Sequence, residues 1–235
     1  MSLEIGFVKN GIQDLSEFEV IDDGLNSAFF HMEKDRELIS ELENLKRPLL
    51  RFYEWEKKAL TYGHFIDPHK YLKLECAEKL GFDIARRPTG GGILFHVQDF
   101  TFTVAIPCHH PNFSKNVLEN YHFVNSTVLR AIEEIGNFCH LAEKRETLPL
   151  REFCMATPTQ YDLLLHGYKI GGAAQRMTRF GFVHQASIFL SQAPWDILVE
   201  LLYDGKNAIE TMKKVSSHIH ISRDELKKKL ILEFT

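Results

Sequence analysis

Three short stretches of this 235-residue sequence carry side chains that could do chemistry, and the first surrounds Cys154. Residues 153–162 follow neither the helical nor the strand period, so we expect a loop there. A cysteine in a loop can be solvated and ionised, which makes its sulfur a better nucleophile than that of a cysteine in an apolar strand. Cys76, Cys108 and Cys139 lie on or beside expected helices and strands, where a small buried hydrophobe is the ordinary interpretation.

The second stretch is His-Gly-Tyr-Lys-Ile-Gly-Gly-Ala-Ala-Gln, in which Lys169 precedes the four tiny residues 171–174. Tiny side chains pack poorly in a strand, but they let a ligand lie flat against the backbone. A surface lysine on a hairpin, followed by a close contact to another element, accounts for the same pattern. The residues alone leave these two interpretations equal.

The third stretch is Arg86-Arg87-Pro-Thr-Gly-Gly-Gly, with His96 four residues further on. Consecutive glycines after a strand allow a ligand to approach the backbone, and their N–H groups can face a polarised oxygen. We expect one of the two arginines to lie beside this loop. A plain glycine-rich turn between two strands is the simpler explanation, since short glycine-rich matches are frequent.

The composition restricts the class of protein. With 28 basic and 32 acidic residues the net charge is −4, which argues against an extended nucleic-acid footprint. No apolar run approaches the ~20 residues of a membrane span, and the first residues lack a signal-peptide pattern, so we expect a cytoplasmic protein that uses no membrane. The four cysteines form no CxxC pair and the histidines have no metal-ligand spacing, so we expect no metal site.

The elements that must position these residues follow from hydrophobic spacing. Strands and helices do not alternate strictly, which favours an α+β fold with a mixed, mostly antiparallel sheet flanked by helices. The alternation at residues 100–106 places one strongly apolar face on its strand. The expected helices cover residues 22–45, 71–80 and 116–135 and much of 194–235. The expected strands cover residues 49–53, 59–62, 83–87, 93–96, 100–106, 161–166, 169–174 and 182–190.

Together, the motifs resemble the lipoate and biotin attachment superfamily. Arg-Phe-Tyr-Glu-Trp at 51–55, followed by Leu-Thr-Tyr-Gly-His-Phe at 60–65, is similar to the family's RFY-x-W…TLS-x-G-x-F segment. Residues 86–96 match its RRxTGGxxxxH loop, and residues 167–174 match its GxKIxGSA strand. Three motifs in the same order with similar separations carry the resemblance, which extends over residues 22–190.

Within that superfamily the sequence is closest to the cysteine-type octanoyltransferases. Cys154 begins their pattern C-x3-P-[ST]-x-Y-[ED], which continues here through Pro158, Thr159, Tyr161 and Asp162. The segment HVQDFTFT at 96–103 resembles their short H-x-x-E-L-T-Y-S segment, and ATP-dependent ligases usually lack this cysteine. There are two departures. Gly92 stands where the transferases often have Arg, and QAS at 185–187 replaces H-G-[ST], with His184 shifted one place forward and its role open.

The resemblance implies one catalytic domain over residues 1–235, with a core at about 22–190 and a helical extension at 194–235. It implies acyl transfer through a Cys154 thioester from acyl carrier protein to a lysine of a lipoyl-domain protein, the acyl group being octanoate or lipoate, without a cofactor. Lys169 is the implied cation beside the thiolate and the acyl carbonyl. The implied substrate-binding residues are Arg86, Arg87, Thr89, Gly90, Gly91, Gly92, His96, Gly172, Ala173 and Ala174.

Two other functions stay open. An ATP-dependent lipoate–protein ligase would hold an acyl-adenylate phosphate with Arg86, Arg87 and the loop at 90–92, and would need ATP and Mg²⁺. A non-catalytic module that binds a lipoyl group in the same pocket would use no nucleophile, and the shifted His184 is its best support. Biotin ligation is a more distant alternative, because that branch's loop is usually richer in arginine.

Overall fold

The computed structural model of the chain describes residues 17–143, 150 and 152–235. Its largest element is a five-stranded sheet in the order β1-β2-β6-β11-β10. β1 runs parallel to β2, and the other neighbouring strands are antiparallel. This confirms the expected α+β fold with a mixed, mostly antiparallel sheet. The five strands are β1 (Glu19–Asn26), β2 (Leu49–Trp55), β6 (Asp99–Pro107), β11 (Gly181–Phe189) and β10 (Gly171–Thr178).

Two three-stranded sheets stand beside the large one. The first has the order β4-β3-β5 and carries the glycine-rich loop between β4 and β5. The second has the order β7-β8-β9 and ends on Lys169. Their strands are β3 (Ala59–Tyr62), β4 (Asp83–Arg86), β5 (Ile93–His96), β7 (Cys139–Leu141), β8 (Leu163–Leu165) and β9 (Tyr168–Lys169).

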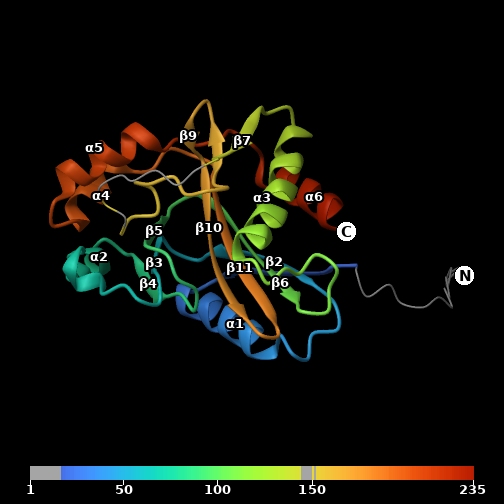
Figure 1. Cartoon of the computed structure of the whole chain (residues 1–235). Helices are drawn as coiled ribbons and strands as arrows, with labels where there is room; N and C mark the ends of the chain where they lie inside the picture. Colours follow the sequence, from blue (N-terminus) through green and yellow to red (C-terminus); the bar gives the residue numbers. More distant parts are fainter. Residues whose placement is uncertain (1–16, 144–149, 151) are drawn as a thin grey trace, which may run out of the picture.

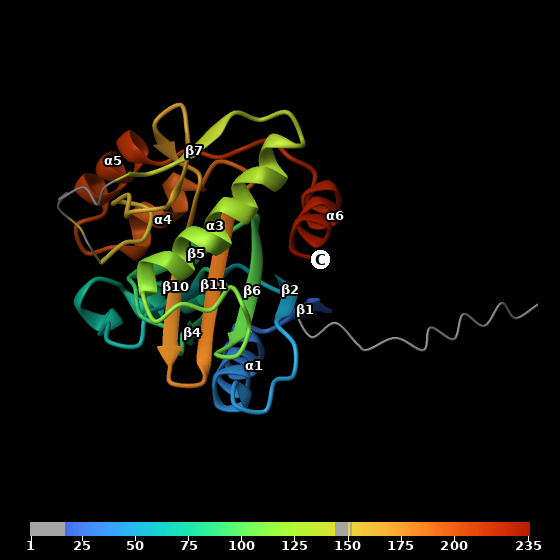
Figure 2. The same ribbon diagram turned by 45° about the vertical axis from the view of Figure 1, so that its right-hand side comes forward.

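The helices cover both faces of the large sheet. In Figures 1 and 2, α3 and α6 lie together on one face, and α1 lies on the other. None of the helices in the described ranges combines the length and the apolar character needed to cross a membrane. The helices are α1 (Ala28–Glu41), α2 (Leu74–Lys79), α3 (Val117–Glu133), α4 (Trp195–Leu201), α5 (Gly205–Val215) and α6 (Arg223–Phe234), with a short 3-10 turn η1 (Pro68–Lys70).

Apolar and polar residues alternate along β6, so the strand has one apolar face and one polar face. Phe100, Phe102, Val104 and Ile106 belong to the apolar cluster that α3 and α6 cover. The intervening threonines face the opposite side, where they hydrogen bond to buried carboxylates. All nine residues of β6 are nevertheless buried, and α1 packs against this strand. The large sheet therefore has one apolar face and one polar face, and the polar face is also buried.

The predicted helix over 22–45 is wrong in its first part. Residues 19–26 form β1, and the helix begins only after Ser27, whose side chain accepts a hydrogen bond from the Phe30 N–H. The apolar residues that suggested a longer helix include Leu25 and Phe29, which are 66% and 67% exposed. Pairing with β2 decides the conformation of this segment, and a local hydrophobic period cannot register that pairing.

Candidate active site

A cavity of about 290 Å³ lies against the polar face of the large sheet, under the β4-β3-β5 sheet. Its lining brings together residues from all three stretches that the sequence singled out. The residues among them that line the cavity are Cys154, Lys169, Arg87, Gly91, Gly92, His96, Gly172, Ala173 and Ala174. The cavity also has apolar walls, which include Met32, Tyr53, Trp55, Leu94, Phe153 and Phe189.

Cys154 lies in an irregular segment, as predicted. Its backbone N–H donates to the Ile93 carbonyl at 2.9 Å, and the preceding Phe153 forms a β-bridge with Ile93. This pairing anchors the cysteine to the start of β5 and beside the glycine-rich loop. The Sγ atom lies 4.0 Å from the Nη2 atom of Arg87.

Lys169 ends β9, and its ammonium group is buried in an ion pair. The Nζ atom donates to Asp162 Oδ2 at 2.7 Å and to the Thr157 carbonyl at 3.2 Å. The side chains of Lys169 and Asp162 are 4% and 2% exposed. An ammonium has three protons, so one donor remains for a ligand in the cavity. Because Asp162 balances the lysine charge, the pair adds little net positive charge to the site.

Arg87 is the arginine that lies beside the loop. Its guanidinium donates to Thr61 Oγ1 at 2.8 Å and to the carbonyls of Gly92 at 2.6 Å and Gly90 at 3.3 Å. These carbonyls therefore face the arginine. Arg86 points the other way: it is exposed and donates to the His64 carbonyl at 2.7 Å, outside the cavity lining.

His96 is enclosed between two polar partners. Its Nε2 atom lies 2.7 Å from Thr61 Oγ1, and its Nδ1 atom lies 2.6 Å from Asp99 Oδ2. Burial alone would raise the pKa of Asp99, but His96, together with hydroxyl donors such as Ser187, lowers it. The histidine ring also packs on Trp55, with ring centroids 4.2 Å apart. This arrangement holds His96 in place on the cavity wall.

Thr89 and Gly90 lie behind the lining. The Thr89 hydroxyl donates to Gln185 Oε1, and the Gln185 amide donates to Asp35. Gln185 therefore occupies a place on the cavity wall, in the segment where the sequence departs from the family pattern. His184, its neighbour on β11, is fully buried with Nδ1 3.1 Å from Gln175 Oε1, and burial lowers its pKa to about 3. It does not line the cavity.

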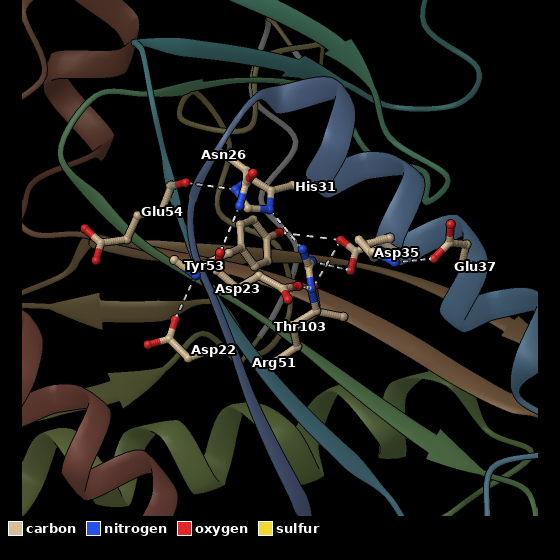
Figure 3. A network of polar contacts seen from close by, with 12 residues as sticks. Asp22, Asp23, Asn26, His31, Asp35, Glu37, Arg51, Tyr53, Glu54 and Thr103 are labelled. Atoms are coloured by element: carbon tan, nitrogen blue, oxygen red, sulfur yellow. Dashed lines mark hydrogen bonds and ion pairs between the residues drawn. The ribbon is translucent and has the colours of Figure 1, made fainter.

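A buried network around Asp35 was missed by sequence reasoning (Figure 3). Asp35 accepts hydrogen bonds from Arg51 Nη1 at 3.0 Å and Thr103 Oγ1 at 3.1 Å. Arg51 also lies 2.9 Å from His31 Nδ1, and burial, with Arg51 nearby, lowers the pKa of His31 to about 4. His31 and Asp35 are spaced four apart on one helix, so a polar pair on an inward helix face was the available signal.

The chain is similar in sequence to proteins of one known family. Residues 27–235 match the family model described as the lipoyl protein ligase A/B catalytic domain. A protein named octanoyltransferase LipM from Lysinibacillus sphaericus is 28% identical over 202 residues, covering 83% of this chain and 73% of that one. The protein of the same name from Carboxydothermus hydrogenoformans is 33% identical over 146 residues, which are 62% of this chain and 54% of that one.

Solved structures share the fold. A lipoate-protein ligase A bound with ATP superposes with a TM-score of 0.72 at 22% identity, covering 93% of this chain and 83% of that one. A bipartite lipoate protein ligase from Thermoplasma acidophilum has a TM-score of 0.68 at 19% identity, covering 93% and 82%. At these identities the likeness concerns the fold alone.

Proposed function

The chain belongs to the lipoyl protein ligase A/B catalytic domain family, and from that premise we propose that it transfers an octanoyl group to a lysine of a lipoyl-domain protein through a thioester on Cys154. One observation carries the proposal. Cys154 and Lys169, which lie on separate segments, line the same cavity, and its other walls include apolar side chains. A nucleophile, a hydrogen-bond donor and a slot for a hydrocarbon are what acyl transfer requires.

In the first step the Cys154 sulfur attacks the carbonyl carbon of an octanoyl thioester on an acyl carrier protein. A new carbon–sulfur bond forms to Cys154, the bond to the carrier sulfur breaks, and the proton from the cysteine leaves with the carrier thiol. The free proton of the Lys169 ammonium would point at the carbonyl oxygen as it becomes negative. In other acyl-transfer enzymes, a well-placed donor of this kind lowers the activation free energy by about 3 kcal/mol.

In the second step the ε-amine of a lysine on the acceptor protein attacks the thioester. The amide bond forms, the bond to Cys154 breaks, and the proton lost by the amine returns to the sulfur. Neither reaction step requires a nucleotide, because hydrolysis-level energy stored in the thioester bond drives the formation of the amide.

The apolar walls would hold the hydrocarbon. Each buried methylene group contributes roughly 0.8 kcal/mol. Gly172 lies against Lys169, and the absence of a side chain there leaves space beside the ammonium group. A Cβ added there would lie 3.0 Å from Lys169 Cε and 3.1 Å from Nζ. A larger residue at this position would compete with the substrate and with the ammonium for the same space.

The experiment is incubation of the protein with octanoyl-acyl carrier protein, followed by intact-protein mass spectrometry. We expect an octanoyl adduct that the Cys154→Ala variant does not form. The Cys108→Ala variant is the matched control, because Cys108 is exposed and remote from the cavity lining. Addition of a lipoyl-domain protein should then move the octanoyl group onto its lysine without ATP.

Other outcomes would replace the proposal. If Cys154→Ala remains fully active and the reaction requires ATP and Mg²⁺ with release of pyrophosphate, the protein is a lipoate–protein ligase. In that case Arg87 and the loop at 90–92 would face an acyl-adenylate. If neither donor acylates the acceptor protein, the cavity serves as a binding module for a lipoyl or octanoyl group.

A further inference from the structure

Arg87 is a buried cation without a carboxylate partner among the described residues. It is 5% exposed, and its hydrogen bonds run to neutral groups, the Thr61 hydroxyl and backbone carbonyls. Its Nε atom is buried and unpartnered in the described part of the chain. Burial of a charge is costly unless an opposite charge compensates it, so a guanidinium in this setting calls for an anion.

The other two deeply buried cations of the described ranges have such partners. Arg51 is paired with Asp35 at 3.0 Å and also with Asp23. Lys169 is paired with Asp162 at 2.7 Å. The contrast places the uncompensated positive charge of the cavity on Arg87, and not on the lysine.

Among the residues that the structure describes, Arg87 contacts one side chain that can become negative, the thiol of Cys154. Its Sγ atom lies 4.0 Å from Arg87 Nη2, and both side chains line the cavity. Gly91 keeps the space beside them open. A Cβ at that position would lie 3.3 Å from Arg87 Nη2 and 4.0 Å from Sγ, and its φ of +84° also favours glycine.

We propose that Arg87 is the counter-ion of the Cys154 sulfur. Its guanidinium stabilises the thiolate before the attack on the acyl thioester and again when the sulfur leaves the acyl group. Lys169, neutralised by Asp162, is then left to hold the carbonyl oxygen. The sequence led us to expect that Lys169 both stabilises the thiolate and holds the acyl carbonyl oxygen, and the inference assigns the first role to Arg87 instead. It rests on the proposed function only because that function makes Cys154 the nucleophile.

The physical basis is the permanence of the arginine charge. A guanidinium stays protonated at every pH at which the enzyme works, whereas a buried lysine can lose its proton. At 4 Å in a partly enclosed site, water screens the interaction between the guanidinium and the sulfur less than it does at the surface, so the positive charge favours the thiolate. The fixed bonds from Arg87 to Gly90 and Gly92 hold the charge at that distance.

The test is the rate of alkylation of Cys154 by iodoacetamide across a pH series, followed by peptide mass spectrometry. In Arg87→Gln we expect the alkylation rate at pH 7 to fall by roughly tenfold, because less of the sulfur is present as thiolate. The exposed thiol of Cys108 serves as the reference inside each sample and should react unchanged. Arg86→Gln is the matched control, because it removes the same charge from the exposed neighbour.

A further variant separates the charge from the geometry of the loop. Arg87→Lys keeps a positive charge but loses the fork that holds the loop carbonyls, so its profile should lie nearer that of the wild type than that of Arg87→Gln. Thermal unfolding checks that each protein is folded.

Two results would overturn the assignment. The first is an unchanged alkylation profile in folded Arg87→Gln. The second is an Arg87→Lys profile as shifted as that of Arg87→Gln. Alkylation needs no acyl donor, so it is independent of the proposed reaction. If the alkylation rate depends on Arg87 but no octanoyl adduct forms, the proposed function is refuted and this inference stands. If the adduct forms but the alkylation rate does not depend on Arg87, the inference is refuted and the proposed function stands.

Discussion

Gly63→Ala should displace the glycine-rich loop, although Gly63 itself does not line the cavity. Gly63 follows β3, and its N–H donates to the Gly92 carbonyl at 3.1 Å. A Cβ at this position would lie 2.0 Å from the Gly91 carbonyl oxygen and 2.8 Å from the Gly90 carbonyl. The neighbouring atoms belong to the backbone, so no side chain can rotate away. Loop and strand must separate by about 1.4 Å to restore an ordinary van der Waals contact.

The cost follows from that overlap. Extra methyl groups forced into a packed site destabilise proteins by about 1–3 kcal/mol. For a chain of this length each kcal/mol lowers the melting temperature by roughly 2–4 °C. The loop carbonyls also hold Arg87 next to Cys154, and a 1 Å displacement of catalytic groups can slow a reaction by about 100-fold. We therefore expect octanoylation of Cys154 to slow by between about 10-fold and 100-fold.

Urea unfolding and single-turnover acylation, followed by mass spectrometry, measure the two effects. Gly90→Ala is the control for stability, because it adds the same methyl group to the same loop with no heavy atom within 4 Å. We expect its free energy of unfolding to stay within about 1 kcal/mol of the wild type. If Gly63→Ala unfolds at the same urea concentration as Gly90→Ala and acylates at the wild-type rate, the steric reasoning is wrong.

Three further outcomes follow from the buried polar groups. Asp35→Leu should lower the free energy of unfolding by about 3–5 kcal/mol in urea, because it leaves the Arg51 charge poorly compensated, and a loss under 1 kcal/mol would contradict this. Gly172→Ala should slow single-turnover acyl transfer several-fold at a near-wild-type unfolding midpoint, since its methyl would press on the Lys169 ammonium. The pKa of His184 is lowered by burial from 6.5 to about 3, so the unfolded chain binds the extra proton between these values. Stability should therefore fall as the pH drops from about 7 to about 4, and urea titrations of His184→Gln should show a flatter dependence.

Much of the local structure was predictable because the relevant signals are local. The apolar period of residues 116–135 predicted α3, and the alternation at 100–106 predicted β6 with its apolar face. The breaker residues at 88–92 predicted the loop between β4 and β5. In each case propensity, hydrophobic spacing and the final environment favour the same conformation.

The errors occurred where distant partners decide the outcome. Residues 19–26 pair with β2 across more than twenty intervening positions, and their helical period carries no information on that pairing. The Asp35 network is a similar case, since Arg51, Thr103 and Gln185 reach the carboxylate from three different strands. The presence of one aspartate in a helix does not allow these partners to be predicted.

The sequence by itself determined the residue types available for chemistry and the motifs that carry the family resemblance. It determined that Cys154, Lys169 and a glycine-rich loop preceded by two arginines are present in the required order. Only the tertiary structure decided which charged side chains lie in contact with one another. Lys169 is neutralised by Asp162, seven residues away, while Arg87 is brought to Cys154 from 67 positions earlier in the chain. Coulomb interactions depend on distance and burial, and neither can be obtained from spacing along the chain until the sheets have packed.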